Sequence, residues 1–150
     1  MLVIRRESSE DQYNNIKEIK GDLFDHVKDR VPVHCISSDY AMGAGIAVPM
    51  AKKYNLRPAL KNIESHTGDV LYVNGVMNMI TKGQVWEKPT YANMFATLKE
   101  LKRQCEKNGV GRLVMPKIGC GIDGLSWEKV RAQIDEVFRD SDIDILICIL

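Results

Sequence analysis

The chain has 150 residues, of which 45% are hydrophobic and 27% are charged, as in a globular domain with a full core. The formal net charge is only +1, so the protein as a whole does not attract anions. An anionic ligand would have to be bound by local features of the chain. No apolar run approaches the roughly 20 residues that span a bilayer, and the N-terminus lacks a signal-peptide pattern. We therefore expect an intracellular protein, cytoplasmic or nuclear if eukaryotic, without a membrane partner.

The first elements predicted are two short strands, over residues 2–4 and 16–20, separated by a polar loop over residues 7–15. Gly21-Asp22 ends the second strand. The Asp22 carboxylate either caps the short segment that follows or accepts hydrogen bonds from a ligand amine. The sequence favours neither alternative.

A Gly-rich turn over residues 37–47 follows the next predicted strand, residues 31–36. Small residues continue from this turn into a helix that runs to about Tyr54. Pro49 is acceptable only in the first turn of a helix, so this helix is predicted to start near Ala47 or Val48.

A further helix is predicted to open at Pro58, run to about Ser65 and close at Thr67-Gly68. Two strands follow, over residues 69–73 and 76–80. The Asn74-Gly75 pair between them predicts a tight hairpin turn, so the two strands should be antiparallel neighbours.

A long helix is predicted from Pro89 to Asn108-Gly109, with an apolar stripe that indicates core packing. The next strand, residues 113–115, enters a second Gly-rich turn with three glycines in six residues, and a helix opens beyond it with Ser126 as N-cap. This succession of a strand, a Gly-rich turn and a helix is typical of a phosphate-binding site. The glycines let backbone N–H groups approach a ligand, and the helix dipole favours an anion.

The last predicted strand is the apolar run over residues 143–150, of a kind typical of strands covered on both faces. Strands that alternate with helices, plus one hairpin, predict an α/β fold with a mixed sheet between helices. Ligands of such folds bind beyond the carboxyl ends of strands. Because both Gly-rich turns leave strands at that end, we expect them to face one cleft.

The four cysteines contain no C-x-x-C pair, and the three histidines are far apart, so we expect neither a zinc site nor a disulfide framework. Cys120, between two glycines, could be a nucleophile, but no histidine is placed nearby to activate it. No cofactor, no metal and no oligomer seam are predicted, so a monomer is expected.

Taken together, these motifs resemble a macrodomain, most closely the branch typified by terminal ADP-ribose protein glycohydrolase. The resemblance runs from about Lys17 to the C-terminus and implies one domain over residues 1–150, with a three-layer α/β/α fold and a mixed, mostly parallel central sheet. The motifs that carry it are Lys20-Gly21-Asp22-Leu23-Phe24, His34-Cys35-Ile36-Ser37, Met42-Gly43-Ala44-Gly45-Ile46-Ala47-Val48, Ile80-Thr81-Lys82, Lys88-Pro89-Thr90-Tyr91 and Met115-Pro116-Lys117-Ile118-Gly119-Cys120-Gly121-Ile122-Asp123.

The resemblance implies an ADP-ribose pocket. Asp22 would accept a hydrogen bond from the adenine amino group, and Leu23 would add a backbone contact. Ser37 would lie at the rim near the distal ribose, although a simple turn at the strand end explains it equally well. Backbone around two sets of residues would hold the diphosphate and distal ribose: Gly43, Ala44, Gly45 and Ile46, and Ile118, Gly119, Cys120, Gly121 and Ile122.

The same branch uses a lysine and an aspartate to cut the bond between ADP-ribose and an acidic side chain, and the matching positions are Lys82 and Asp123. A lysine amine can attack the anomeric carbon if it is unprotonated, and burial would favour that form. Asp123 could serve as general base or acid. An ion pair with Asp123 would instead keep Lys82 charged, and the sequence does not decide between the two.

Three functions follow from the resemblance. The first is hydrolysis of ADP-ribose from modified glutamate or aspartate side chains of proteins, with deacylation of O-acetyl-ADP-ribose as a related reaction. The second is a reader module that binds ADP-ribose without cutting it, which would need neither Lys82 nor Asp123. The third is removal of ADP-ribose from nucleic-acid bases, although the near-neutral charge argues mildly against tight DNA binding.

Overall fold

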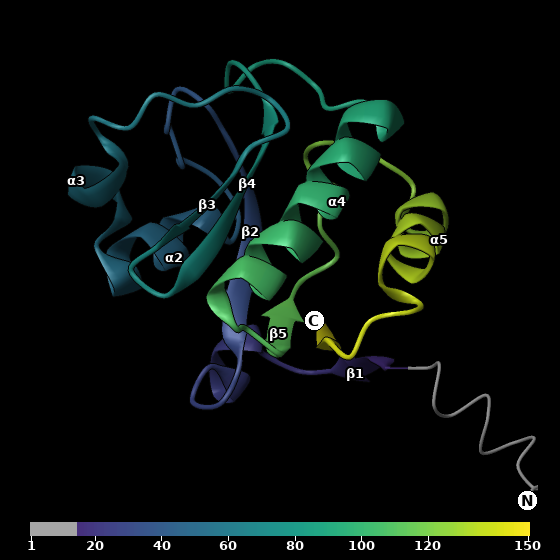
Figure 1. Ribbon diagram of the computed structural model, residues 1–150. Coiled ribbons are helices and arrows are strands. Elements are labelled where there is room, and N and C mark those ends of the chain that lie inside the picture. Colours follow the sequence, from purple (N-terminus) through teal and green to yellow (C-terminus); the bar gives the residue numbers. More distant parts are fainter. Residues whose placement is uncertain (1–14) are drawn as a thin grey trace, which may run out of the picture.

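The computed structural model describes residues 15–150, in which a six-stranded sheet lies between two layers of helices (Figure 1). The strands are β1 (Ile16–Lys20), β2 (Val31–Ser37), β3 (Val70–Val73), β4 (Val76–Lys82), β5 (Arg112–Met115) and β6 (Asp144–Ile149). The helices are the short 3-10 helix η1 (Leu23–His26), α2 (Ala47–Tyr54), α3 (Leu56–Leu60), α4 (Tyr91–Asn108) and α5 (Trp127–Phe138). The strand predicted over residues 2–4 falls outside the described residues.

The sheet has the strand order β1-β6-β5-β2-β4-β3. Every neighbouring pair is parallel except β3 and β4, which form the antiparallel hairpin expected from Asn74-Gly75. Asn74 has φ 51° and Gly75 has φ 78°, so both turn residues are left-handed, as a tight hairpin turn requires. The prediction of a mixed, mostly parallel sheet is confirmed.

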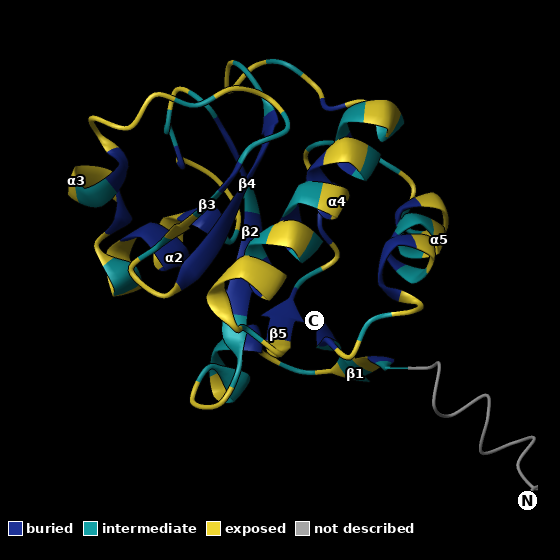
Figure 2. Cartoon of the chain, viewed as in Figure 1, coloured by how far each residue is buried: buried dark blue, intermediate teal, exposed yellow. Residues whose placement is uncertain are grey.

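Two hydrophobic clusters lie on opposite faces of the sheet. Along β4 the side chains alternate: Met77 and Met79 pack with α4 and α5, whereas Val76 and Ile80 pack with η1, α2 and α3. Figure 2 shows the result, with most of β2, β4, β5 and β6 buried and the outer faces of the helices exposed. The architecture is therefore the expected three-layer α/β/α sandwich. Within residues 15–150, none of the helices combines the length and apolar character needed to cross a membrane.

The boundaries of two predicted helices were wrong. The helix expected over residues 58–65 is α3, which begins at Leu56 after the left-handed Asn55, with Pro58 inside its first turn. It ends at Leu60 because the next segment is held as a loop, where the Tyr40 hydroxyl lies 2.6 Å from Ile63 O.

The helix expected from Pro89 is α4, which begins at Tyr91. Thr90 is its N-cap in an extended conformation, and the Thr90 side chain accepts a hydrogen bond from the Asn93 amide. The first helix after β2 starts at Ala47, as predicted. Ser126 takes the expected N-cap position of α5, although its side chain makes no capping hydrogen bond.

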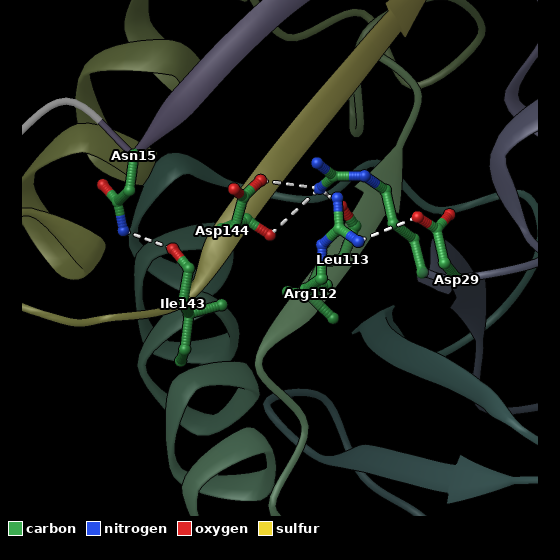
Figure 3. Close-up of polar contacts among 7 residues, drawn as sticks. Asn15, Asp29, Arg112, Leu113, Ile143 and Asp144 are labelled. Atoms are coloured by element: carbon green, nitrogen blue, oxygen red, sulfur yellow. Dashed lines mark hydrogen bonds and ion pairs between the residues drawn. The ribbon is translucent and has the colours of Figure 1, made fainter.

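Polar contacts join the amino ends of β2, β5 and β6 (Figure 3). Arg30 Nη1 lies 2.7 Å from Asp144 Oδ1 and donates to Leu113 O at 3.0 Å. Arg112 pairs with Asp29 at 2.8 Å. Because these strands are parallel, the Gly-rich turns leave from the opposite end of the sheet.

Candidate active site

A cavity of about 560 Å³ opens at the carboxyl ends of β2, β4 and β6, where the two Gly-rich turns meet. Residues 42–47 of the first turn and residues 116–123 of the second form its main walls. Lys82 at the end of β4 and residues 148–150 at the end of β6 complete it. The expected single cleft between both turns is confirmed.

The first Gly-rich turn presents backbone N–H groups beside the start of α2. The amides of Tyr40, Ala41 and Val48 donate hydrogen bonds within this region. The amides of residues 43–46 donate none to the described part of the chain. α2 begins at Ala47 without a side-chain cap. Amides that have no hydrogen bond within residues 15–150, together with the positive end of a helix dipole, are suited to bind an anion such as a diphosphate.

The second Gly-rich turn is built around left-handed glycines. Gly119 has φ 74° and Gly121 has φ 69°, conformations that other residues adopt only with strain. A Cβ at Gly119 would lie 2.5 Å from Met94 Cε, so the turn also packs tightly against α4. Hydrogen bonds inside the turn use the amides of Cys120, Gly124 and Leu125, and those of Gly119, Gly121 and Ile122 are outside this set.

The Lys82 ammonium and the Asp123 carboxylate meet at the wall of this cavity. Lys82 Nζ donates to Asp123 Oδ1 at 2.7 Å, and the two side chains are 11% and 18% exposed. Asp123 thus has the partner that its local sequence did not reveal. The two groups form an ion pair, and their low exposure reduces its screening by solvent compared with a pair at the surface.

An irregularity in the sheet sets the position of Lys82. Ile36 of β2 pairs with Ile80 of β4, but the next residue, Ser37, pairs with Lys82, so Thr81 is the extra residue of a bulge. Bulges redirect the side chains beside them and are common next to active sites. Ser38 N then donates to Lys82 O at 3.0 Å, which holds the backbone of this lysine against the first Gly-rich turn.

Asp39 ties the first Gly-rich turn to the loop that follows Lys82. Its carboxylate accepts hydrogen bonds from the Ser37 hydroxyl, from Ala41 N at 3.1 Å and from Val85 N at 2.9 Å. Desolvation alone would raise the pKa of Asp39, but these hydrogen bonds and the Lys82 charge together outweigh it, so the pKa lies below its ordinary value. The ionised form of Asp39 is therefore the one that holds the two loops.

Cys35 and Cys120 line the same cavity as thiols. Burial raises the pKa of Cys35 to about 12, and the nearby Asp123 carboxylate adds to this effect. Burial also raises the pKa of Cys120, against a smaller opposite effect of Lys117. Neither sulfur has the thiolate character of a catalytic nucleophile, which argues against the reading of Cys120 as one.

The remaining predicted site residues differ in their placement. Ser37 lines the cavity, and its hydroxyl proton is donated to Asp39. Asp22 and Leu23 are not among the lining residues. Leu23 is buried in the core, and Asp22 Oδ1 accepts a hydrogen bond from Phe24 N at 3.0 Å as the cap of η1. Gly21 N bonds to Ile149 O, so Asp22 lies beside the end of β6 that borders the cavity.

Several residues that line the cavity were not predicted from the sequence. Residues 148–150 could have been predicted to line the cavity, because they lie at the carboxyl end of the last strand and all parallel strands end at the same edge of the sheet. Val85 and Trp127 also line the cavity, and no sequence pattern marked them. Among residues 15–150, no group of three or more His, Cys, Asp or Glu residues is placed to hold a metal ion.

Comparisons with known proteins agree with this geometry. A family model described as Macro domain matches residues 33–134. The chain is 44% identical over 138 residues to the ADP-ribose glycohydrolase OARD1 of Homo sapiens, an overlap that covers 89% of this chain and 91% of that protein.

Solved structures share the fold. The macrodomain of Mycobacterium tuberculosis DarG matches with a TM-score of 0.78 and 23% identity, covering 89% of this chain and 96% of that chain. Thermosipho africanus DarTG in complex with ADP-ribose matches with a TM-score of 0.77 and 18% identity, covering 91% of this chain and 42% of that chain.

Proposed function

The chain belongs to the macrodomain family, and from this premise we propose that it is a hydrolase that binds ADP-ribose and removes it from modified glutamate and aspartate side chains of proteins. The observation that carries the proposal is the Lys82–Asp123 pair at the wall of the cavity between the Gly-rich turns. A module that only recognises ADP-ribose has no need of a buried lysine and carboxylate at this position. The similarity to a named ADP-ribose glycohydrolase over most of both chains supports the same conclusion.

In the bound state, the diphosphate would lie between the two turns and accept hydrogen bonds from their amides. The distal ribose would then reach the Lys82–Asp123 pair, and the adenine would lie toward the end of β6 and Asp22. A solved structure with the same fold holds ADP-ribose, which supports this ligand. The two charges of the Lys82–Asp123 ion pair cancel. The backbone amides of the two turns therefore supply most of the attraction for the diphosphate.

The reaction begins with a proton transfer. Asp123 Oδ1, at 2.7 Å, is within reach of the proton that Lys82 must lose before its amine can attack. The Nζ–C1″ bond then forms as the bond from C1″ to the ester oxygen breaks, and the protein carboxylate leaves with the electron pair. Opening of the ribose ring converts this adduct into an imine. Water hydrolyses the imine, which releases ADP-ribose and restores the lysine amine.

An acyl group on the C1″ oxygen of the distal ribose would leave by the same step, so we include deacylation of O-acetyl-ADP-ribose that carries its acetyl group at this position as a side activity. ADP-ribosylated proteins are the partners in this proposal, and an intracellular monomer is the form in which we expect the protein to act. Removal of ADP-ribose from nucleic-acid bases is the alternative that the experiment must separate.

The test measures release of ADP-ribose from a glutamate-modified protein and from modified DNA, together with the affinity for free ADP-ribose. Wild type, Lys82→Ala and Asp123→Ala are compared, with Lys99→Ala and Asp142→Ala as matched controls away from the cavity. We expect the wild type to release ADP-ribose from the modified protein. Lys82→Ala and Asp123→Ala should lose this release but still bind free ADP-ribose. Tight binding without release by the wild type would leave a reader module, and release from DNA alone would change the substrate class.

A further inference from the structure

A second cavity, of about 410 Å³, shares Lys82 with the ADP-ribose cavity. Trp86, Lys88 and Asn93 line this second cavity and do not line the first. In a substrate, the group attached to the distal ribose must extend out of the ADP-ribose cavity, and the second cavity adjoins the first at Lys82. The second cavity is therefore where the leaving group would lie.

Two large apolar side chains close to Lys82 and Asp123 in the chain are exposed, one in each of the cavities that Lys82 lines. Trp86, four residues after Lys82, is 74% exposed, and Ile122, directly before Asp123, is 66% exposed. Exposed single apolar residues are ordinary, but an indole and an isoleucine in the two cavities that share Lys82 offer contact surface to a substrate.

Hydrogen bonds hold the loop that carries Trp86. Gln84 N donates to Glu87 Oε1 at 2.8 Å, and Glu87 N donates to Gln84 O at 3.0 Å. Val85 N donates to Asp39 Oδ2 at 2.9 Å. The Lys88 ammonium donates to the Ile122 carbonyl, so this loop and the second Gly-rich turn are joined. A surface that is already ordered binds at a lower entropic cost than a mobile one.

From these observations we propose that Trp86 and Ile122 form a leaving-group subsite that contacts an apolar side chain next to the modified residue of a protein substrate. The inference rests on the proposed function and specifies its substrate. Charge argues for a peptide rather than a nucleic acid. Lys82 is paired with Asp123, and the Glu87 carboxylate in the same cavity balances the charge of Lys88, so the rim has no net positive charge for a phosphate backbone.

The test uses two ADP-ribosylated peptides that differ only in the residue after the modified glutamate, leucine in one and glycine in the other. For the wild type we expect kcat/KM to be about five- to tenfold higher with the leucine peptide. Trp86→Ala should abolish this difference through KM, with kcat and the affinity for free ADP-ribose unchanged. Trp86→Phe should retain most of the difference, and Tyr72→Ala, which removes an exposed aromatic side chain outside both cavities, should retain all of it.

Equal kcat/KM values for the two peptides in the wild type would overturn the subsite while leaving the hydrolase intact. A Trp86→Ala effect confined to an ADP-ribosylated nucleobase would also overturn it. If the wild type releases nothing, the same peptides are compared by affinity. Tighter binding of the leucine peptide that depends on Trp86 would then support the subsite even though the hydrolase had failed, and equal affinities would reject both.

Discussion

Lys82 Nζ and Asp123 Oδ1 lie 2.7 Å apart although 41 residues separate them along the chain. β4 and its bulge position the lysine, and the left-handed glycines of the second Gly-rich turn position the aspartate. The fold thus places an amine and a carboxylate in contact at one wall of a cavity. The predictions that follow test this arrangement and the groups that support it.

The first prediction concerns the energy of the pair. Lys82→Met or Asp123→Leu leaves one largely buried charge without its partner, so each should lower the free energy of unfolding by roughly 1–3 kcal/mol. The double variant should lose less than the sum of the two, because it leaves no charge unpaired. Urea denaturation of all four proteins measures the coupling. Strictly additive losses would mean that the two side chains do not interact in solution.

The second prediction concerns the backbone of the second Gly-rich turn. Gly121→Ala should cost about 1–2 kcal/mol of stability, since only the left-handed backbone opposes it. Gly119→Ala should cost more, about 2–4 kcal/mol, because its methyl group also displaces Met94 Cε. Thermal and urea unfolding give both values. Similar losses for the two variants would show that Met94 moves aside freely.

The third prediction concerns Asp39. Asp39→Ala should speed hydrogen exchange at the amides of Ala41 and Val85 and lower the rate of ADP-ribose release about tenfold or more, because Lys82 is less well positioned. Asp69→Ala, which removes a similar side-chain bond to the His66 amide, serves as the control. Because the pKa of Asp39 is lowered in the folded protein, its contribution is present above the ordinary value of 3.8 and is lost as pH falls through the lower, folded value. Slow exchange at Val85 in Asp39→Ala would contradict this role.

The fourth prediction separates the two readings of Asp22. If Asp22 contacts adenine, Asp22→Ala should weaken binding of ADP-ribose about tenfold and leave binding of ribose 5-phosphate, which lacks adenine, unchanged. Calorimetry with both ligands makes the comparison. A loss of stability with equal affinities for ADP-ribose in wild type and variant would leave Asp22 as the cap of η1 alone.

The fifth prediction uses the buried His34, whose Nε2 lies 2.7 Å from Asn78 Oδ1. Burial lowers the pKa of His34 from 6.5 to about 4, against a smaller opposite effect of the Asn78 hydrogen bond. Between these pH values the unfolded chain binds a proton that the folded protein excludes. The stabilisation that comes from keeping His34 neutral is therefore fully present above pH 6.5. The free energy of unfolding falls by roughly 3 kcal/mol as the pH drops from 6.5 to about 4.

Unfolding of wild type and His34→Gln is compared at intervals from pH 7 to pH 4. The variant should lose this part of the pH dependence, whereas His66→Gln, at a solvent-exposed histidine, should keep it. Parallel curves for wild type and His34→Gln would show that the His34 ring is accessible to protons in the folded protein.

Local chemistry determined much of the fold from the sequence alone. Asn74-Gly75 specified the hairpin, Pro49 limited the start of α2, and the apolar run of β6 indicated a strand covered on both faces. These features depend on backbone sterics and on burial of neighbouring side chains, so a short stretch carries the whole signal. The failures lay at α3 and α4, where Asn55 and Thr90 moved the boundaries through a left-handed conformation and a side-chain cap.

The site divides in the same way. The sequence by itself marked both Gly-rich turns, and with the family resemblance it marked Lys82 and Asp123. Only the tertiary structure decided that these two form an ion pair, that the bulge at Thr81 positions the lysine and that Trp86 and Ile122 are exposed. Contacts between residues 41 positions apart depend on strand order and register, which are properties of the assembled sheet, and no short stretch of the chain encodes them.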